Sequence, residues 1–259
     1  MDLGLQGKWA LVCGASSGLG MACAMSLARE GVNVVMAART EHTLLQSVEY
    51  IKSNTGGHVI AVVADVSRPE DRLRMVQAAP QIDILINNAG GPKPADFRDL
   101  SREDWLAAID MNMLAPIELI KLTIDQMIER RFGRIVNITS GAVKSPVDML
   151  ILSNGPRAGL TGAVSGIARQ VAQHNVTINN VMPGKFDTDR LRSNNSRRAS
   201  QSGRSLDEEV ALQVSTIPAR RLGTAPEFGE ACAFLCSQQA GYITAQSLLI
   251  DGGLYPGIL

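Results

Sequence analysis

A glycine-rich turn between an apolar segment and a helical segment constrains the fold of this chain more than any other feature. The turn runs from Gly14 to Gly20, after the apolar residues 9–13 and before the helical segment 21–29. Glycine lets the backbone turn sharply and lets a phosphate approach the main chain, and the first N–H groups of a helix attract an anion. The pattern therefore predicts a strand, a turn and a helix that bind the pyrophosphate of a dinucleotide. The alternative is an ordinary tight connection between a strand and a helix.

Short apolar segments alternate with helical ones along the whole chain. Beyond the first, the segments expected to form strands are 32–37, 59–63, 82–87, 134–138, 177–181 and 247–250. Nearly continuous apolar character is typical of parallel strands that are buried on both faces. The alternation predicts an α/β fold with a doubly wound parallel sheet and helices on both faces, formed by a single domain over residues 1–259. Capping boxes at Ser67–Glu70, at Thr224–Glu227 and, more weakly, at Ser101–Asp104 predict three helix starts.

Composition and charge exclude several classes of partner. The chain has 25 Lys and Arg residues against 25 Asp and Glu residues, so its bulk charge favours neither nucleic acid nor membrane binding. No apolar run reaches the roughly 18–20 residues of a membrane span. The first residues lack a basic segment followed by an apolar one, so we expect no signal peptide and a cytoplasmic protein. The four cysteines lack the spacing of a metal site, and we expect them to pack as small apolar side chains.

One segment departs from the alternation of strands and helices. Residues 187–205 are polar and rich in Arg, Ser and Asn, and we expect a functional lid or a mobile loop, within a substrate-loop region over 187–219. Five arginines make this segment basic: Arg190, Arg192, Arg197, Arg198 and Arg204. They could attract a phosphorylated or carboxylated substrate, including an acyl carrier, or they could belong to a solvated loop.

The order of the short motifs resembles that of the short-chain dehydrogenase/reductase family over essentially the full length of the chain. The matching residues are Gly14, Gly18, Gly20, Asp65, Val66, residues 87–90, Asn112, Ser140, Pro183, Gly184 and residues 251–253. The resemblance implies a Rossmann-like sheet, a nicotinamide cofactor and a homo-oligomer, usually a tetramer. Within the family the chain is similar to the 3-oxoacyl-carrier reductases, although that likeness rests on the general scaffold.

The same resemblance implies a set of cofactor contacts. It assigns Asp65 and Val66 to the adenine, and Pro183, Gly184 and Thr188 to the nicotinamide end. The other contacts that we expect are Gly14, Ser16, Ser17, Gly18, Leu19, Gly20, Asn87, Ala89 and Gly90. Residues 87–90 and 183–184 each follow a predicted strand, and the ends of parallel strands converge on one crevice. Ordinary strand-ending turns are the alternative for both motifs.

The end of the second predicted strand indicates which dinucleotide binds. Ala38 stands where an acidic residue would accept hydrogen bonds from the adenosine ribose of NAD, and Arg39 follows it. Because a guanidinium can pair bidentately with a ribose 2′-phosphate, the sequence favours NADP over NAD. Thr40 and Ser16 are expected to be secondary phosphate contacts. A solvated arginine at the end of a strand is the alternative.

The catalytic segment departs from the family pattern. The resemblance implies that Ser140 orients a substrate carbonyl and that Asn112 supports a water relay. Ser153 and Arg157, however, stand where the family has a proton-donating tyrosine and a lysine that lowers its pKa and holds the nicotinamide ribose. A serine hydroxyl can donate a hydrogen bond but is a far weaker acid than a phenol. An arginine can hold ribose hydroxyls but stays protonated.

Three functions remain open at this point. The first is an NADP(H)-dependent oxidoreductase acting on a small carbonyl or alcohol substrate with altered proton-transfer groups. Lys144 and Asp148 are candidates for the missing acid, unless they are surface charges. The second is a non-catalytic dinucleotide-binding protein that acts as a sensor or partner, which the lost tyrosine and lysine favour. The third is a non-redox reaction, such as an elimination, on the same scaffold.

Overall fold

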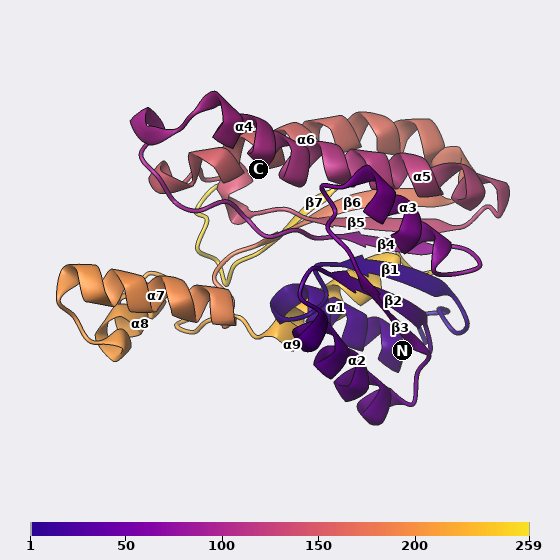
Figure 1. Ribbon diagram of the computed structural model, residues 1–259, viewed down its shortest axis with the longest axis horizontal. Helices are drawn as coiled ribbons and strands as arrows, with labels where there is room; N and C mark the ends of the chain where they lie inside the picture. The colour runs from indigo at the N-terminus through magenta and orange to yellow at the C-terminus, as the bar shows by residue number, and fades with distance from the viewer. Residues whose placement is uncertain (1, 259) are drawn as a thin grey trace.

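A parallel sheet of seven strands forms the centre of the molecule, in the order β3-β2-β1-β4-β5-β6-β7 (Figure 1). The computed structural model describes residues 2–258. The strands are β1 (Trp9–Cys13), β2 (Asn33–Ala38), β3 (Val59–Val63), β4 (Ile84–Asn87), β5 (Gly133–Ile138), β6 (Val176–Pro183) and β7 (Ser247–Ile250). Every predicted strand is confirmed, with bounds within two residues of the prediction. The strand order reverses between β1 and β4, so the loops that follow these two strands diverge.

Helices cover both faces of the sheet, which confirms the predicted doubly wound fold (Figure 1). One face carries α1 (Gly18–Arg29), α2 (Glu41–Thr55) and α9 (Ala225–Cys236). The other carries α3 (Pro69–Gln77), α5 (Ala115–Glu129) and α6 (Ile151–Val171). A further helix, α4 (Arg102–Ile109), leads through a π-helical turn, η2 (Asp110–Leu114), into α5.

The two hydrophobic cores explain why the strands are apolar throughout. In β1, Ala10 and Val12 face the core beneath α1 and α9, whereas Leu11 and Cys13 face the core beneath α5 and α6. Successive side chains of a strand point to opposite faces, so every side chain of a strand that is covered on both faces is buried and tends to be apolar. All four cysteines are buried, as predicted. Burial raises the pKa of the Cys13 thiol to about 12, so the thiol stays neutral.

Two of the three predicted capping boxes are present. Ser101 and Asp104 start α4, and Thr224 and Glu227 start α9, in each case with reciprocal side-chain and backbone hydrogen bonds. The third prediction is wrong, because α3 begins at Pro69 without a side-chain cap. The hydroxyl of Ser67 instead donates to Asp65 Oδ1 over 2.8 Å and stabilises the turn after β3.

Most of the segment 187–205 is helical, so of the two expectations for it the loop is wrong, and the functional lid stays a prediction. It contains α7 (Asp189–Ser202), followed by α8 (Leu206–Ser215), and the pair extends away from the layered body of the protein (Figure 1). Polar composition does not prevent a helix that buries only a narrow stripe. Here the stripe includes Asn195, which accepts a hydrogen bond from Gln213 Nε2 of α8. Among residues 2–258, no helix is both long and apolar enough to cross a membrane.

Candidate active site

A cleft of about 500 Å³ lies where the carboxyl ends of the central strands meet, beside the reversal in strand order. Open α/β sheets bind ligands at this position because the flanking loops diverge there. The predicted site residues that line it are Gly14, Ser16, Ser17, Gly18, Leu19, Arg39, Thr40, Asp65, Val66, Ala89, Gly90, Ser140, Ser153, Arg157, Pro183, Gly184 and Thr188. The fold thus brings together most of the residues that the sequence singled out. Three of the predicted residues, Gly20, Asn87 and Asn112, lie outside its wall.

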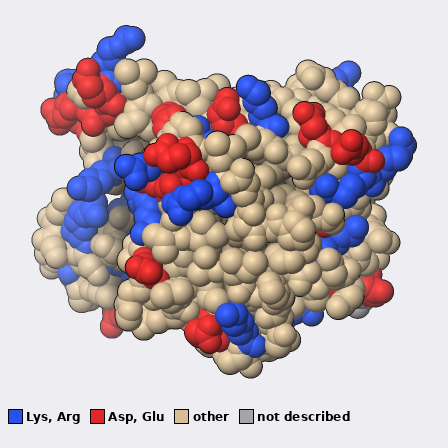
Figure 2. Space-filling view, turned by 45° about the vertical axis from the view of Figure 1, so that its right-hand side comes forward, with Lys and Arg blue, Asp and Glu red and all other residues tan. Residues whose placement is uncertain are grey.

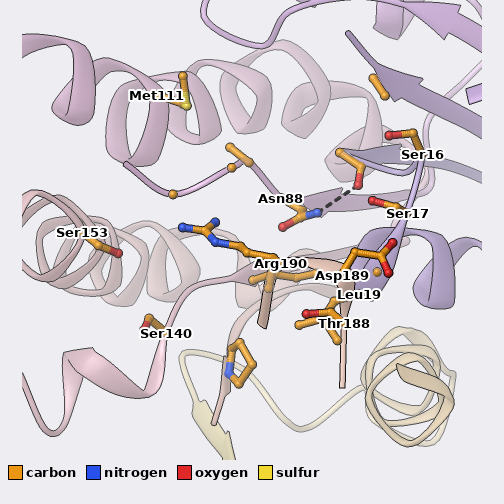
Figure 3. A pocket seen from close by; sticks show the side chains of 18 of the residues that line it. Ser16, Ser17, Leu19, Asn88, Met111, Ser140, Ser153, Thr188, Asp189 and Arg190 are labelled. Carbon is orange, nitrogen blue, oxygen red and sulfur yellow. Dashed lines mark hydrogen bonds between the residues drawn. The ribbon is translucent and has the colours of Figure 1, made fainter. Parts of the chain in front are cut away.

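The glycine-rich turn forms one end of the cleft. Gly14 has φ +57°, in the left-handed region that favours glycine, and its carbonyl accepts a hydrogen bond of 3.1 Å from Asn88 Nδ2 (Figure 3). A Cβ on Gly20 would collide with that carbonyl, so Gly20 lets α1 start close to the turn. Ser17 precedes α1 in an extended conformation, and its side chain does not cap the helix. The first N–H groups of α1 therefore remain available for an anion, as a dinucleotide pyrophosphate requires.

Asn87 belongs to a buried row of side chains beneath the cleft rather than to its wall. Its Nδ2 donates to Asn137 Oδ1 over 2.9 Å. Asn137 Nδ2 donates in turn to Asn180 Oδ1, and Asn180 Nδ2 to Ser247 Oγ, each over 3.2 Å. These residues are neighbours in register on β4, β5, β6 and β7. The Asn87 side chain therefore joins the strands that carry the site, and a contact between Asn87 and the cofactor stays a prediction.

The end of β2 carries the groups that would distinguish NADP from NAD. Arg39 is exposed at this end of the cleft, and its Nη1 lies 3.9 Å from Asp65 Oδ2. Exposed ion pairs of this kind contribute little, so Arg39 can turn to a phosphate at small cost. Thr40 precedes α2 without capping it, which leaves its hydroxyl available. A guanidinium and a free hydroxyl beside the uncharged Ala38 fit a ribose 2′-phosphate.

Arg157 lies at the opposite end of the cleft, where it joins two strands to α6. It is 7% exposed, and its Nη1 donates to the carbonyl oxygens of Ile138 (2.7 Å) and Thr139 (2.9 Å). Its Nη2 donates to the carbonyl oxygen of Ala89 over 3.3 Å, and its Nε to Ser153 Oγ over 3.2 Å. A guanidinium has five N–H groups, so one remains for a ligand. Burial, and secondarily the charge of Arg190, lowers the pKa of Arg157 to about 10, which leaves it charged at neutral pH.

Two serine hydroxyls face this end of the cleft. Ser153 Oγ accepts its hydrogen bond from Arg157, so its own hydrogen is available to a ligand. Ser140 Oγ accepts a hydrogen bond of 3.1 Å from the Ala142 N–H at the start of a short 3₁₀ turn, which likewise leaves its hydrogen available. Figure 3 shows both side chains on the same side of the pocket. Among the described residues that line the cleft there is no tyrosine.

Asn112 lies behind the cleft wall, in the π-helical turn η2. Its Nδ2 donates to the Ala108 carbonyl over 3.3 Å, while its buried Oδ1 has no hydrogen-bond partner within residues 2–258. A buried amide oxygen of this kind calls for an ordered water, which fits the predicted relay. Lys144 and Asp148, the candidates for the missing acid, do not line the cleft. The ammonium of Lys144 instead lies 5.8 Å from the centre of the Tyr255 ring.

Among the lining residues that were not predicted as contacts, two have polar side chains with a clear place in the site. Asn88 holds the glycine-rich turn through its bond to Gly14, and its place within the motif 87–90 could have indicated a role. Arg190, on the first turn of α7, reaches into the cleft. The sequence grouped it with four other arginines, and nothing in the pattern separates it from them. Asp189 and Leu191 accompany it in the wall.

Comparison with known proteins identifies the family. The sequence model of the protein family described as short chain dehydrogenase matches residues 8–199. The chain belongs to the short-chain dehydrogenase family. It is 34% identical over 256 residues to the 3-oxoacyl-[acyl-carrier-protein] reductase FabG of Escherichia coli, covering 98% of this chain and 99% of that protein. It is 33% identical over 258 residues to the NADPH-dependent reductase BacG of Bacillus subtilis, covering 95% and 97%. The predicted family resemblance is confirmed.

Solved structures of reductases share this fold over the whole chain. YwfH, an NADPH-dependent reductase involved in bacilysin biosynthesis, superposes with a TM-score of 0.92 at 31% identity, covering 98% of this chain and 100% of that one. The L-sorbose reductase of Gluconobacter frateurii, solved with NADPH and L-sorbose, superposes with a TM-score of 0.95 at 26% identity, covering both chains fully. The chain is thus similar in sequence to one NADPH-dependent reductase and in structure to reductases that are NADPH-dependent or were solved with NADPH.

Proposed function

We propose that this short-chain dehydrogenase is an NADPH-dependent oxidoreductase that interconverts a small carbonyl compound and its alcohol. One observation carries the proposal: a single cleft has a cradle for phosphate at one end and the hydroxyls of Ser140 and Ser153 at the other. A dinucleotide laid along the cleft would bring its nicotinamide to the two hydroxyls. The NADPH-dependent relatives support the same cofactor here.

The residues of the cleft divide among the parts of NADPH. The turn at 14–19 and the start of α1 would hold the pyrophosphate, and Asp65 and Val66 the adenine. Arg39, with Thr40 and Ser16, would hold the 2′-phosphate. Pro183, Gly184 and Thr188 would hold the nicotinamide end, and the remaining N–H of Arg157 would reach its ribose. When bound, NADPH supplies a hydride to the carbonyl carbon of the substrate.

The protein's part in the reaction is to stabilise charge on the substrate oxygen. As the carbon is reduced, the electron pair of the C=O bond moves onto oxygen, and the hydroxyls of Ser140 and Ser153 donate hydrogen bonds to it. Arg157 polarises the Ser153 hydroxyl through the Nε–Oγ hydrogen bond and strengthens it as a donor. Neither serine is acidic enough to supply the proton, so the proton comes from water in the cleft. Asn112 Oδ1, which lies behind the cleft wall, would support this relay only through further water molecules.

A second candidate is a non-catalytic protein that binds the dinucleotide. It is favoured by the absence of a phenol from the cleft and by the four hydrogen bonds that tie Arg157 to the protein. To separate the two functions, NADPH binding is measured first by calorimetry, and NADPH oxidation is then measured against a panel of aldehydes and ketones. Oxidation that depends on a carbonyl compound supports the reductase. Tight binding of NADPH without turnover on any carbonyl supports the non-catalytic protein, and a substrate changed without NADPH consumption supports a non-redox reaction.

We further propose a cytoplasmic homotetramer made of one domain per chain, with residues 187–219 as the substrate region. Apolar side chains support association: Leu106 on α4 and Leu114 on η2 are exposed, and so is Ile258 near the carboxyl end. Closed symmetric oligomers are the usual outcome for enzymes of this kind. Sedimentation of the purified chain at micromolar concentration should give the mass of a tetramer, and a monomer would contradict the proposal.

A further inference from the structure

The guanidinium of Arg190 lies in the cleft without an anionic partner. Within residues 2–258 it forms no ion pair and no hydrogen bond, although the side chain lines the cleft. Arg192, two residues further along α7, pairs with both oxygens of Asp187, and Arg204 pairs with Glu209. Of the five arginines in this region, only Arg190 lines the cleft. Lys and Arg side chains also gather around a hollow at the left edge of the view in Figure 2.

The position of Arg190 directs its charge to the catalytic end. Its Nη2 lies 2.5 Å from the point that a Cβ on Gly91 would occupy, so the guanidinium rests against the loop that follows β4. In Figure 3 it points toward the side of the pocket where Ser153 lies and away from Ser16 and Ser17. The charge of Arg190 also contributes, after burial, to the lowered pKa of Arg157. The cleft therefore concentrates positive charge beside the reacting groups.

No acidic side chain among residues 2–258 pairs with the Arg190 guanidinium. Asp189 is the nearest acidic residue in sequence and also lines the cleft, but its Oδ1 lies 3.9 Å from Arg192 Nη1. In Figure 3 its carboxylate points to the opposite side of the pocket from the Arg190 guanidinium. Removal of water by the surrounding protein lowers the pKa of Arg190, so an anion bound there would be attracted more strongly than in bulk water. A guanidinium with free parallel N–H groups is suited to a carboxylate, which it can bind bidentately.

We propose that Arg190 binds a carboxylate of the substrate, so that the compounds reduced in this cleft are oxo acids. The inference rests on the proposed reductase function and names its substrate class. A phosphate of the cofactor is the other anion that could meet Arg190. Arg190, however, points away from Ser16 and Ser17 of the phosphate cradle and toward the side of the pocket where Ser153 lies (Figure 3). A carboxylate held by Arg190 would place the carbonyl of a short oxo acid near the two serine hydroxyls.

The test measures binding of matched acids and esters, which does not depend on turnover. Pyruvate, acetoacetate and levulinate, each beside its methyl ester, are titrated into the protein saturated with NADP⁺, so that no hydride can be transferred. At least one acid should bind more tightly than its ester. Arg190→Ala should raise the dissociation constant of that acid roughly 10- to 100-fold, as loss of a hydrogen-bonded charge does, and leave the ester unchanged. Arg190→Lys should recover part of the affinity as a point charge.

Arg197→Ala is the matched control, because it removes the same charge from the same helix outside the cleft. It should leave the binding of acids unchanged. The inference is overturned if no acid binds better than its ester, or if Arg190→Ala weakens NADPH binding instead, since Arg190 would then serve a cofactor phosphate. NADPH oxidation, measured in parallel, separates this inference from the proposed function. If esters and acids are reduced equally well, the reductase function is supported and the preference for oxo acids is contradicted. If acids bind through Arg190 but NADPH is never oxidised, carboxylate binding is supported and the reductase function is contradicted.

Discussion

Arg157 Nε and Ser153 Oγ lie 3.2 Å apart within helix α6, one helical turn from each other. Residues four apart share a face of a helix, so the spacing that the family uses for tyrosine and lysine is kept. The Arg157 guanidinium donates three further hydrogen bonds, to the carbonyl oxygens of residues 89, 138 and 139. These bonds fix the guanidinium, which in turn fixes the position of the Ser153 hydroxyl. We therefore infer that Arg157 fixes and polarises the Ser153 hydroxyl but does not make it an acid.

Ser153→Ala should lower kcat roughly 10²-fold, as removal of one preorganised donor to a developing oxyanion does. The affinity for NADPH should stay the same, because the cradle for its phosphates lies at the other end of the cleft. Single-turnover oxidation of bound NADPH measures the rate, and calorimetry measures the affinity. Ser165→Ala is the control, a serine of the same helix outside the cleft whose hydroxyl donates to the Thr161 carbonyl. An unchanged rate in Ser153→Ala would remove Ser153 from the reaction.

Arg157→Met should lower the free energy of unfolding by about 2–4 kcal/mol, because it leaves buried carbonyl oxygens without donors. Arg157→Lys should cost less, since an ammonium can still satisfy some of them. Urea denaturation of the three proteins, followed by circular dichroism, gives the free energies. If Arg157→Met is as stable as the wild type, the hydrogen bonds from Arg157 to the buried carbonyl oxygens do not stabilise the fold.

Arg39→Ala should raise the dissociation constant of NADPH roughly 10- to 100-fold and leave that of NADH unchanged, because only NADPH carries the 2′-phosphate. Fluorescence titration with both cofactors measures the difference. Arg68→Ala provides the control, since Arg68 is exposed, pairs with Glu70 and lies outside the cleft. Equal weakening of NADH and NADPH would mean that Arg39 does not select the phosphate.

Glu227 gives a prediction for the dependence of stability on pH. Hydrogen bonds from Arg221 and from the capped start of α9 lower the pKa of its carboxyl from 4.5 to about 2. A folded-state pKa below the unfolded one contributes stability that is present above pH 4.5 and is lost as the pH falls toward 2. The stability difference between wild type and Glu227→Gln should therefore be constant above pH 5 or so and shrink across this window. Chemical denaturation at pH values above, within and below the window measures it, and a difference that does not vary with pH would contradict the assignment.

The fold could be predicted because its strands carry a strong pattern. Each is apolar without interruption, since side chains on both faces enter a core, as Leu11 and Val12 do on opposite sides of β1. The turn at 14–20 and the motifs that follow β4 and β6 then fall at one edge of the sheet. Most of the predicted contacts meet in the cleft for this reason. The helix in the segment 187–205 was not predicted because α7 buries little apolar surface.

The orientation of individual side chains could not be predicted. Asn87 and Asn88 are adjacent in sequence, yet one joins strands beneath the cleft and the other holds the glycine-rich turn. Which of the two does which depends on the register between strands. The hydrogen bonds of Arg157 go to backbone carbonyls, which every residue possesses and no motif marks. Arg190 and Arg192 lie two residues apart on α7, yet Arg190 lines the cleft whereas Arg192 pairs with Asp187.

The central claim is that the Ser153–Arg157 cleft carries out reduction by hydride transfer, and isotope transfer tests it most directly. The protein is incubated with an oxo acid and with NADPH that carries deuterium at both C4 positions, and the product is analysed by mass spectrometry. We predict a hydroxy acid that carries one deuterium at the carbon that was the carbonyl, formed much more slowly by Ser153→Ala. Bound NADPH with no deuterium in any product, across acids and neutral carbonyl compounds alike, would contradict the account.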